Sequence, residues 1–147
     1  MAAEVHDIVD EQLRRTRQRY TRGRRQLVEL LLDIGRPVTI PELLDHGATQ
    51  SQSSLYRNLA ILEQCGAVER LASTDDVARY ELTEELAGHH HHLVCSICGR
   101  IEDVVFPPAV ERALALAAGE ARDQRGFVVE SHKIELFGTC RSCATSS

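Results

Sequence analysis

Four of the five cysteines occur as two Cys-x-x-Cys pairs, Cys95/Cys98 and Cys140/Cys143, while Cys65 stands alone. Two intervening residues allow a tight turn that directs both sulfur atoms of a pair at one point. Four thiolates around one ion form the closed tetrahedral site typical of structural zinc. A redox-active dithiol is the alternative for a single pair, but two pairs flanking one short segment favour metal binding. We therefore predict a zinc site that contributes to the folding free energy of the C-terminal half.

A run of four histidines, His89 to His92, leads directly into the apolar sequence before the first cysteine pair. The alternatives to a metal site are an expression-tag remnant, which usually lies at a terminus, and a solvated loop. Successive side chains of a strand point to opposite faces. We therefore expect His89 and His91 to face one metal ion, and His90 and His92 to face another.

Each histidine pair needs further ligands from other segments. Glu111 and His132 are the candidates for the first pair, with His132 expected in the final strand. For the second pair, the available acids lie before the histidine run and after the first cysteine pair: Glu69, Glu81, Glu84, Glu85 and Asp103. An isolated surface glutamate is usually a solvated charge, so these acids gain weight only because the histidines need partners.

An arginine-rich segment lies near the N-terminus. Between Arg14 and Arg25 the sequence RRTRQRYTRGRR contains seven arginines and no acidic residue. The whole chain carries a net charge of −5 with histidine neutral, so its basic character is local. A solvated helix face is one interpretation, and a stripe that contacts nucleic-acid phosphates is the other.

The elements that must position these groups fall into two halves that meet near residue 86. Apolar spacing predicts a helix capped by Thr21 and ended by Gly35, then a short helix around 41–45, and a third helix over 53–64. The last two helices, joined by a tight link, make a helix-turn-helix candidate.

Two short strands are predicted after the third helix, over 68–71 and 78–82, with Ser-Thr-Asp-Asp turn chemistry between them. A helix-turn-helix followed by a hairpin is the winged-helix layout. A small helical domain with an incidental hairpin is the alternative.

The sequence of the second half predicts two strands, a helix and a further strand, a β-β-α-β order. Two strands flank the first cysteine pair, a helix runs from Pro107 or Pro108 to Gly126, and an extended strand or bent pair covers 127–140. A domain of about 60 residues has too small a core to be comfortably stable alone. It would gain from a metal ion, from dimerisation, or from both.

The order of a winged helix, HHHHLVCSICG and HKIELFGTCRSC resembles the ferric uptake regulator family of metal-sensing repressors, from about Arg14 to Cys143. The resemblance implies an α+β homodimer. Its winged helix-turn-helix DNA-binding domain would cover 1–86, with a hinge at about 83–88, and its metal-binding dimerisation domain would cover 87–147. It also implies a palindromic double-stranded DNA operator, one structural zinc, and one or two regulatory ions.

The resemblance also implies roles for individual residues. The structural zinc ligands would be Cys95, Cys98, Cys140 and Cys143. A site inside the dimerisation domain, which requires one inserted residue before its glutamate, would use His89, His91, Glu111 and His132. A hinge site would use His90 and His92, with Glu81 where iron sensors place an acid and Glu69 where zinc sensors place one.

Two departures from the family pattern concern the hinge site. Arg36 stands where iron- and peroxide-sensing members have a histidine, and the segment before the histidine run lacks the cysteine that zinc sensors tend to have. The hinge site is therefore expected to be oxygen-rich, with Glu81 or Glu84 and Glu85 as open alternatives. The histidine run and HKIELFGTC are most similar to zinc uptake regulators. Nitrogen-rich tetrahedral sites suit Zn²⁺, with Fe²⁺ or Mn²⁺ as alternatives at the regulatory sites.

The predicted recognition helix carries the sequence LYRNL, which resembles the family motif TVYRxL. In that motif the tyrosine meets thymine methyl groups and the arginine meets a base or a phosphate. A half-buried packing role is the alternative for this tyrosine. The candidate DNA-contacting residues are Arg19, Arg22, Arg24, Ser54, Tyr56 and Arg57.

These features predict a metal-responsive repressor of metal uptake genes, most like a zinc sensor, with neither enzymatic activity nor a small-molecule substrate. The absence of an export signal or a long apolar run predicts a cytoplasmic protein without membrane contact. An iron, manganese or peroxide sensor of the same family is the alternative. A zinc buffer would leave the arginine-rich segment unexplained, and a zinc hydrolase would need an open site and a general base, for which the sequence has no motif.

Overall fold

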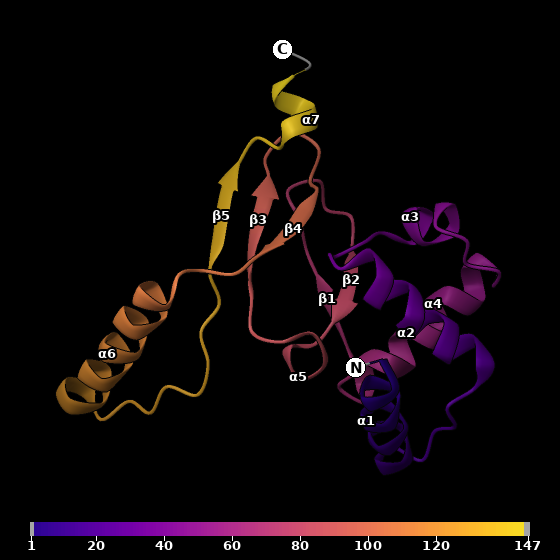
Figure 1. Cartoon of the computed structure of the whole chain (residues 1–147), viewed down its shortest axis with the longest axis horizontal. Helices are drawn as coiled ribbons and strands as arrows, with labels where there is room; N and C mark the ends of the chain where they lie inside the picture. Colours follow the sequence, from indigo (N-terminus) through magenta and orange to yellow (C-terminus); the bar gives the residue numbers. More distant parts are fainter. Residues whose placement is uncertain (1, 146–147) are drawn as a thin grey trace.

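The computed structural model describes residues 2–145, and Figure 1 shows a helical first part and a sheet-containing second part with the β1–β2 hairpin between them. The helices of the first part are α1 (Ala2–Arg15), α2 (Arg22–Ile34), α3 (Ile40–Asp45) and α4 (Gln52–Gln64). Its hairpin consists of β1 (Val68–Leu71) and β2 (Arg79–Leu82). The second part consists of α5 (Glu84–Ala87), β3 (His91–Cys95), β4 (Ile101–Val104), α6 (Pro108–Arg125), β5 (Glu135–Gly138) and α7 (Arg141–Ala144).

Local signals set the boundaries of the helices. The Thr21 side chain accepts a hydrogen bond from the first turn of α2, and Gly35 ends that helix at a φ of 65°, which glycine adopts without strain. Thr39 and Glu42 form a reciprocal capping box at the start of α3. The order of four helices followed by the β1–β2 hairpin, with a separate sheet after it, confirms the predicted winged-helix layout and the α+β class. The predicted boundary near residue 86 falls within α5.

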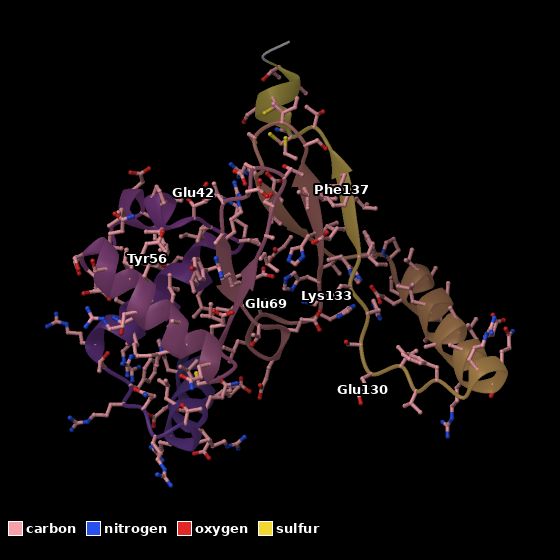
Figure 2. The ribbon with its side chains drawn as sticks, turned by 180° about the vertical axis from the view of Figure 1, so that it is seen from behind. Glu42, Tyr56, Glu69, Glu130, Lys133 and Phe137 are labelled. Atoms are coloured by element: carbon pink, nitrogen blue, oxygen red, sulfur yellow. The ribbon has the colours of Figure 1, made fainter. Side chains whose placement is uncertain are left out.

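The main hydrophobic core lies in the first part. Leu55, Leu59 and Leu62 on one face of α4 are fully buried, as are Leu27 and Val28 of α2. The α1 helix, whose role the sequence did not reveal, buries further apolar side chains against the same core. Because α4 turns its apolar face inward, the opposite face is left to solvent, where Tyr56 lies in Figure 2.

The second part is built on a three-stranded sheet with the order β4-β3-β5. β4 pairs with β3 in antiparallel fashion, and β5 pairs with β3 in parallel. The expected extended strand or bent pair over 127–140 is wrong, because only Glu135–Gly138 of this segment forms a strand. Ladder pairing with β3 extends no further back than the Ile134 carbonyl, which accepts from His92 N–H at 3.2 Å. His132 therefore lies in an irregular segment just before β5, not within the final strand.

The α6 helix stands away from the sheet (Figure 1), and none of its 18 residues is buried. Its Leu116 is 72% exposed, and Phe127 after its end is 63% exposed. On the neighbouring β5 strand, Phe137 is 62% exposed. Large apolar side chains of α6, of the segment after it and of β5 are thus left uncovered in a single chain, which is typical of a protein interface. None of the described helices combines the length and the hydropathy needed to span a membrane.

Candidate metal centres and nucleic-acid interface

The four paired cysteines converge beside the sheet. β3 ends at Cys95, α7 begins just after Cys140, and the four sulfur atoms lie within 4.8 Å of one another. The Cys98 and Cys140 sulfurs are 3.7 Å apart. The backbone N–H of Cys140 donates to the Cys95 sulfur at 3.4 Å, and this contact, with those of the Cys98 and Ile97 N–H groups, lowers the pKa of Cys95 to about 6.

The sulfur cluster fits a divalent cation. The neighbouring Cys140 sulfur raises the pKa of the Cys143 thiol to about 12, because crowded thiols resist a second ionisation. A cation bound among the sulfurs would remove that penalty and stabilise four thiolates together. Four sulfur donors within 4.8 Å of one another match the ligand set of a structural zinc ion.

A second cluster consists of His89, His91, Glu111 and His132, whose ligand atoms lie within 4.8 Å of one another. Glu111, in the first turn of α6, is central to it. Glu111 Oε1 lies 2.7 Å from His91 Nε2, and Oε2 lies 3.1 Å from His132 Nε2. The His91 hydrogen bond lowers the pKa of Glu111, which keeps the carboxylate charged.

His91 is the most buried member of this cluster. Its side chain is 1% exposed, and its ring stacks on Phe106 with centroids 4.5 Å apart. Within the described part of the chain, its Nδ1 atom has no hydrogen-bond partner. The packed ring therefore presents Nε2 to the cluster, where three imidazole nitrogens and one carboxylate suit Zn²⁺ and other late divalent metals.

A third cluster joins the hairpin to the sheet, and it contains Glu81, His90, His92 and Asp103. Glu81 of β2 is 5% exposed. Its Oε2 lies 3.2 Å from His90 Nε2, and its Oε1 lies 2.8 Å from His92 Nε2. Asp103 of β4 approaches the same nitrogens at 3.7 and 3.8 Å.

Electrostatics in the third cluster favour a bound cation. Burial raises the pKa of Asp103 to about 6, and the Glu81 carboxylate raises it as well. Burial lowers the pKa of His90, but the Gly88 carbonyl and the two acids outweigh it and leave this pKa raised. Asp103 Oδ1 is buried and lacks a hydrogen-bond partner among residues 2–145. Two close carboxylates with an unpaired buried oxygen fit a divalent cation.

Asp103 was one of several acids considered from the sequence, but it was not placed in the predicted hinge site. The antiparallel pairing of β3 with β4 sets His92 directly opposite Asp103. This register follows from folding the two strands around the Cys-x-x-Cys turn, so the pairing itself was the signal that could have identified Asp103.

Three other candidate acids lie outside the third cluster. Glu69 of β1 forms an ion pair with Lys133, and Figure 2 shows the two side chains near each other. Glu84 lies 3.1 Å from His89 Nδ1 and raises the pKa of that histidine. Glu85 accepts a hydrogen bond from the Gln12 amide of α1 at 2.9 Å.

The Arg36 guanidinium group is occupied by partners near the start of α3. One guanidinium nitrogen lies 3.2 Å from Glu42 Oε1, and another donates to the Pro37 carbonyl at 3.1 Å. Residue 36 therefore supports the start of α3.

The candidate DNA-contacting residues lie on α4 and around the start of α2. Tyr56 is 51% exposed, and Arg57, Arg19 and Arg22 are also exposed. Ser54 is half-buried, and its hydroxyl accepts from that of Ser51 at 3.0 Å.

Arg24 differs from the other candidates because the fold already uses its guanidinium group. Its Nε donates to Asn58 Oδ1 at 3.2 Å, and another nitrogen donates to the Arg19 carbonyl. Arg24 thus links α2 to α4 and to the arginine-rich segment.

Comparison with known proteins identifies relatives across most of the chain. A model of the ferric uptake regulator family matches residues 15–137. The peroxide operon regulator of Bacillus subtilis (strain 168) is 27% identical over 138 residues, which cover 91% of this chain and 90% of the relative. The peroxide-responsive repressor of Staphylococcus aureus (strain USA300) is 28% identical over 95 residues, which cover 63% of this chain and only 57% of the relative.

Solved structures share the fold. The Helicobacter pylori ferric uptake regulator has a TM-score of 0.74 at 22% identity, over 98% of this chain and 94% of that one. A zinc-bound manganese uptake regulator has a TM-score of 0.61 at 26% identity, over 90% of this chain and 98% of that one. These relatives are regulators rather than enzymes, as the sequence predicted. The chain therefore belongs to the ferric uptake regulator family of metal-responsive transcriptional regulators.

Proposed function

We propose that this chain is a zinc-responsive repressor of metal uptake genes that binds a palindromic operator as a homodimer. The observation that carries the proposal is the Glu81, His90, His92 and Asp103 cluster, called the hinge cluster below. Glu81 belongs to the hairpin of the winged-helix part, whereas the other three residues belong to the sheet-containing part. The cluster therefore contains ligands from both sides of the predicted hinge.

The hinge cluster provides a physical route from metal concentration to DNA binding. A divalent cation bound there would neutralise the two carboxylates and accept lone pairs from neutral imidazoles. Glu81 would then be held against His90 and His92, which limits rotation of the winged-helix part. A ligand shifts such an equilibrium only by its preference for one arrangement, so a 100-fold gain in operator affinity requires about 2.7 kcal/mol of coupling.

Family members act as DNA-binding dimers, and the exposed apolar surface of α6 and β5 supports a homodimer of this chain. In that dimer the two α4 helices would enter successive major grooves, and their N-terminal residues would meet base edges. We assign base or backbone contacts to Tyr56, Arg57 and Ser54, and phosphate or minor-groove contacts to Arg19 and Arg22. Arg24 would contribute mainly by supporting α4.

The cysteine cluster is assigned to a structural zinc ion. The cluster of His89, His91, Glu111 and His132 is assigned to a second regulatory or structural ion. Its three imidazoles favour zinc there. Zinc is also our preferred hinge ion, because two of the four hinge ligands are imidazoles.

A second candidate function is a manganese, iron or peroxide sensor. The observation that favours it is the presence of two carboxylates, Glu81 and Asp103, in the hinge cluster. Oxygen donors suit Mn²⁺ and Fe²⁺ better than they suit zinc. The names of a peroxide regulator and a manganese uptake regulator among the relatives agree with this alternative.

The test separates metal content from metal response. Protein is mildly chelated, reloaded with Zn²⁺, Mn²⁺ or anaerobic Fe²⁺, and titrated onto a labelled duplex selected from a random pool. Zn²⁺ outcompetes Mn²⁺ and Fe²⁺ at most protein sites, so the DNA affinities of the fully loaded forms are compared rather than their metal affinities. We expect the cysteine zinc to survive chelation and Zn²⁺ to restore the tightest binding. Equal DNA binding with and without metal would contradict metal sensing, and restoration by Mn²⁺ or Fe²⁺ alone would support the alternative.

A further inference from the structure

The tip of the β1–β2 hairpin contacts the turn that carries the first cysteine pair. We call residues 73–76 the wing tip and residues 95–99 the knuckle. The Ser73 hydroxyl donates to the Gly99 carbonyl at 2.5 Å, and the Thr74 hydroxyl donates to the Cys95 carbonyl at 2.8 Å. These bonds join segments more than 20 residues apart, and they connect the winged-helix part to the sheet-containing part.

The wing tip is held rigidly by its own chain. The Asp75 carboxylate accepts two hydrogen bonds from the Arg79 guanidinium, at 2.7 and 2.9 Å, and the Arg79 side chain is only 6% exposed. The Val77 N–H also donates to Asp75 at 3.1 Å, and the Asp76 N–H closes the turn onto the Ser73 carbonyl at 3.1 Å. These bonds hold the backbone turn that carries the Ser73 and Thr74 hydroxyls.

The knuckle offers a matching surface. The Gly99 N–H donates to the Cys95 carbonyl at 3.0 Å and closes the turn that brings the Cys95 and Cys98 sulfurs together. The same Cys95 carbonyl accepts the Thr74 hydroxyl. Gly99 has a φ of 77°, and a side chain at this buried position would overlap the Asp75 carboxylate. A residue with a Cβ atom is thus excluded from the place where the wing tip rests.

The two ends of the hairpin are attached to the sheet-containing part at different places. One contact is at Glu81, in the hinge cluster, and the other is at the wing tip. A single contact leaves a rigid part free to rotate about it, whereas two separated contacts leave only rotation about the line that joins them, and the Glu69–Lys133 ion pair restricts that rotation further. We propose that Ser73 and Thr74 are positioning residues that lock the winged-helix part onto the knuckle and so set the orientation in which it meets DNA.

This inference rests on the proposed function for its effect on DNA, and it adds a role for the cysteine site. The carbonyl groups that receive the wing tip hold their positions only while the knuckle is folded around its cysteines. The cysteine site would therefore orient the winged-helix part as well as stabilise the sheet. No charge changes in this contact, so its strength should depend little on salt.

The test compares variants that differ by single atoms or groups. Ser73→Ala with Thr74→Val removes both hydroxyls. Thr74→Ser keeps the hydroxyl that donates to the Cys95 carbonyl. Thr16→Val is the matched control, because the Thr16 hydroxyl also donates to a backbone carbonyl, that of Leu13 at 3.0 Å, but within the winged-helix part. Each protein is studied as the full chain with zinc bound. Cobalt substitution monitors the thiolate site, and light scattering monitors the dimer.

The arrangement of the two parts is measured first and does not depend on DNA. In Ser73→Ala/Thr74→Val we expect faster amide hydrogen exchange in peptides covering 73–77 and 95–100, with an increased radius of gyration by small-angle X-ray scattering. The cobalt–thiolate absorption and the dimer mass should stay unchanged. Thr74→Ser and Thr16→Val should match the wild type. Unchanged exchange and scattering in the double variant would overturn the proposal.

Affinity for the selected duplex is measured second, with zinc at saturation. We expect the double variant to bind about tenfold more weakly, which corresponds to about 1.4 kcal/mol and to two net hydrogen bonds. Wild-type affinity in the double variant would overturn the positioning role even if exchange changed. If the DNA affinity of the wild-type protein did not depend on metal, the proposed function would be refuted. The scattering and exchange results would still show whether the wing tip is bound to the knuckle.

Discussion

His91 and His92 are consecutive residues of β3, yet their imidazoles meet different carboxylates. His91 Nε2 lies 2.7 Å from Glu111, and His92 Nε2 lies 2.8 Å from Glu81. The alternation of a strand separates the two rings onto opposite faces of the sheet. One face carries the cluster that includes the start of α6, and the other carries the hinge cluster. Two metal clusters with different partners are thus built on adjacent positions of one strand.

Replacing His90 and His92 with alanine should abolish metal-dependent DNA binding and leave the dimer folded. Both imidazoles contact Glu81, whereas neither belongs to the cysteine cluster. Binding to the selected duplex, measured with and without zinc, should become equal in the variant. Glu130→Gln, at an exposed carboxylate outside all three clusters, is the control and should respond to zinc as the wild type does. A variant that still responds to zinc would contradict hinge sensing.

Asp103, rather than residue 36, should complete the hinge cluster. Asp103→Ala removes the buried oxygen that lacks a partner, so the zinc affinity of this cluster should fall by about tenfold or more, as for loss of a charged ligand. Arg36→Lys keeps the positive charge beside Glu42 and should leave that affinity unchanged. Competition with a chromophoric chelator measures both. The opposite order of effects would show that the ligand set is assigned incorrectly.

Cys95→Ser should remove the structural zinc and destabilise the sheet-containing part. Cys95 is buried and receives the Cys140 N–H, so its loss affects both cysteine pairs. The expected result is less than one thiolate-bound zinc per chain, by metal analysis, and a monomeric or unfolded protein by light scattering. Cys65→Ser is the matched control, since that thiol donates to the Leu62 carbonyl, within the helical part. A stable dimer without this zinc would show that the site is dispensable.

Metal binding at the hinge cluster should weaken as the pH falls. The pKa of His90 is raised above its ordinary value, and that of Asp103 is raised to about 6, so both groups take up protons in the metal-free protein as the pH falls below neutrality. Protons and metal compete for the same atoms, and each displaced proton contributes a change of about tenfold per pH unit. Zinc titrations at constant ionic strength between about pH 5.5 and about pH 8, a range that spans these pKa values, should show this loss. A pH-independent affinity would contradict the ligand assignment.

Reversing the charge of either Glu69 or Lys133 should weaken the metal-dependent DNA binding without abolishing it. Lys133 directly follows His132, a member of the second cluster (His89, His91, Glu111 and His132), and Glu69 belongs to β1. The ion pair therefore links the second cluster to the hairpin. Exposed ion pairs contribute at most about 1 kcal/mol, so either single reversal should weaken metal-dependent DNA binding by no more than about fivefold. The double reversal, Glu69→Lys with Lys133→Glu, should recover most of the loss at low salt. Additive losses in the double variant would show that the pair has no role in coupling.

The sequence predicted the elements whose signals are local. The cap at Thr21, the glycine stop at Gly35 and the leucine spacing of α4 each act within one or two turns of chain. The cysteine cluster was also predictable, because the spacing within each pair constrains its sulfurs strongly.

What the sequence missed depends on contacts between distant segments. The length of the final strand was overestimated because β5 can pair only where β3 offers a partner, and the apolar residues after Gly126 extend beyond it. The place of Asp103 depended on the register of β3 with β4, and that of Glu69 on an ion pair across the two parts. The contact between the wing tip and the knuckle uses Ser73 and Thr74, which ordinary turn chemistry already explains.

The isolated position of α6 has a consequence for how the protein would respond to its own abundance. Glu111 sits in the first turn of this helix, so a cluster that needs Glu111 is complete only when α6 is held in place. If a second copy holds it, then association and metal uptake at that cluster are linked by mass action. Dilution would lower the metal affinity of the cluster. A cell that makes more of the protein would raise that affinity, so that the cluster fills at a lower metal concentration without any change in sequence.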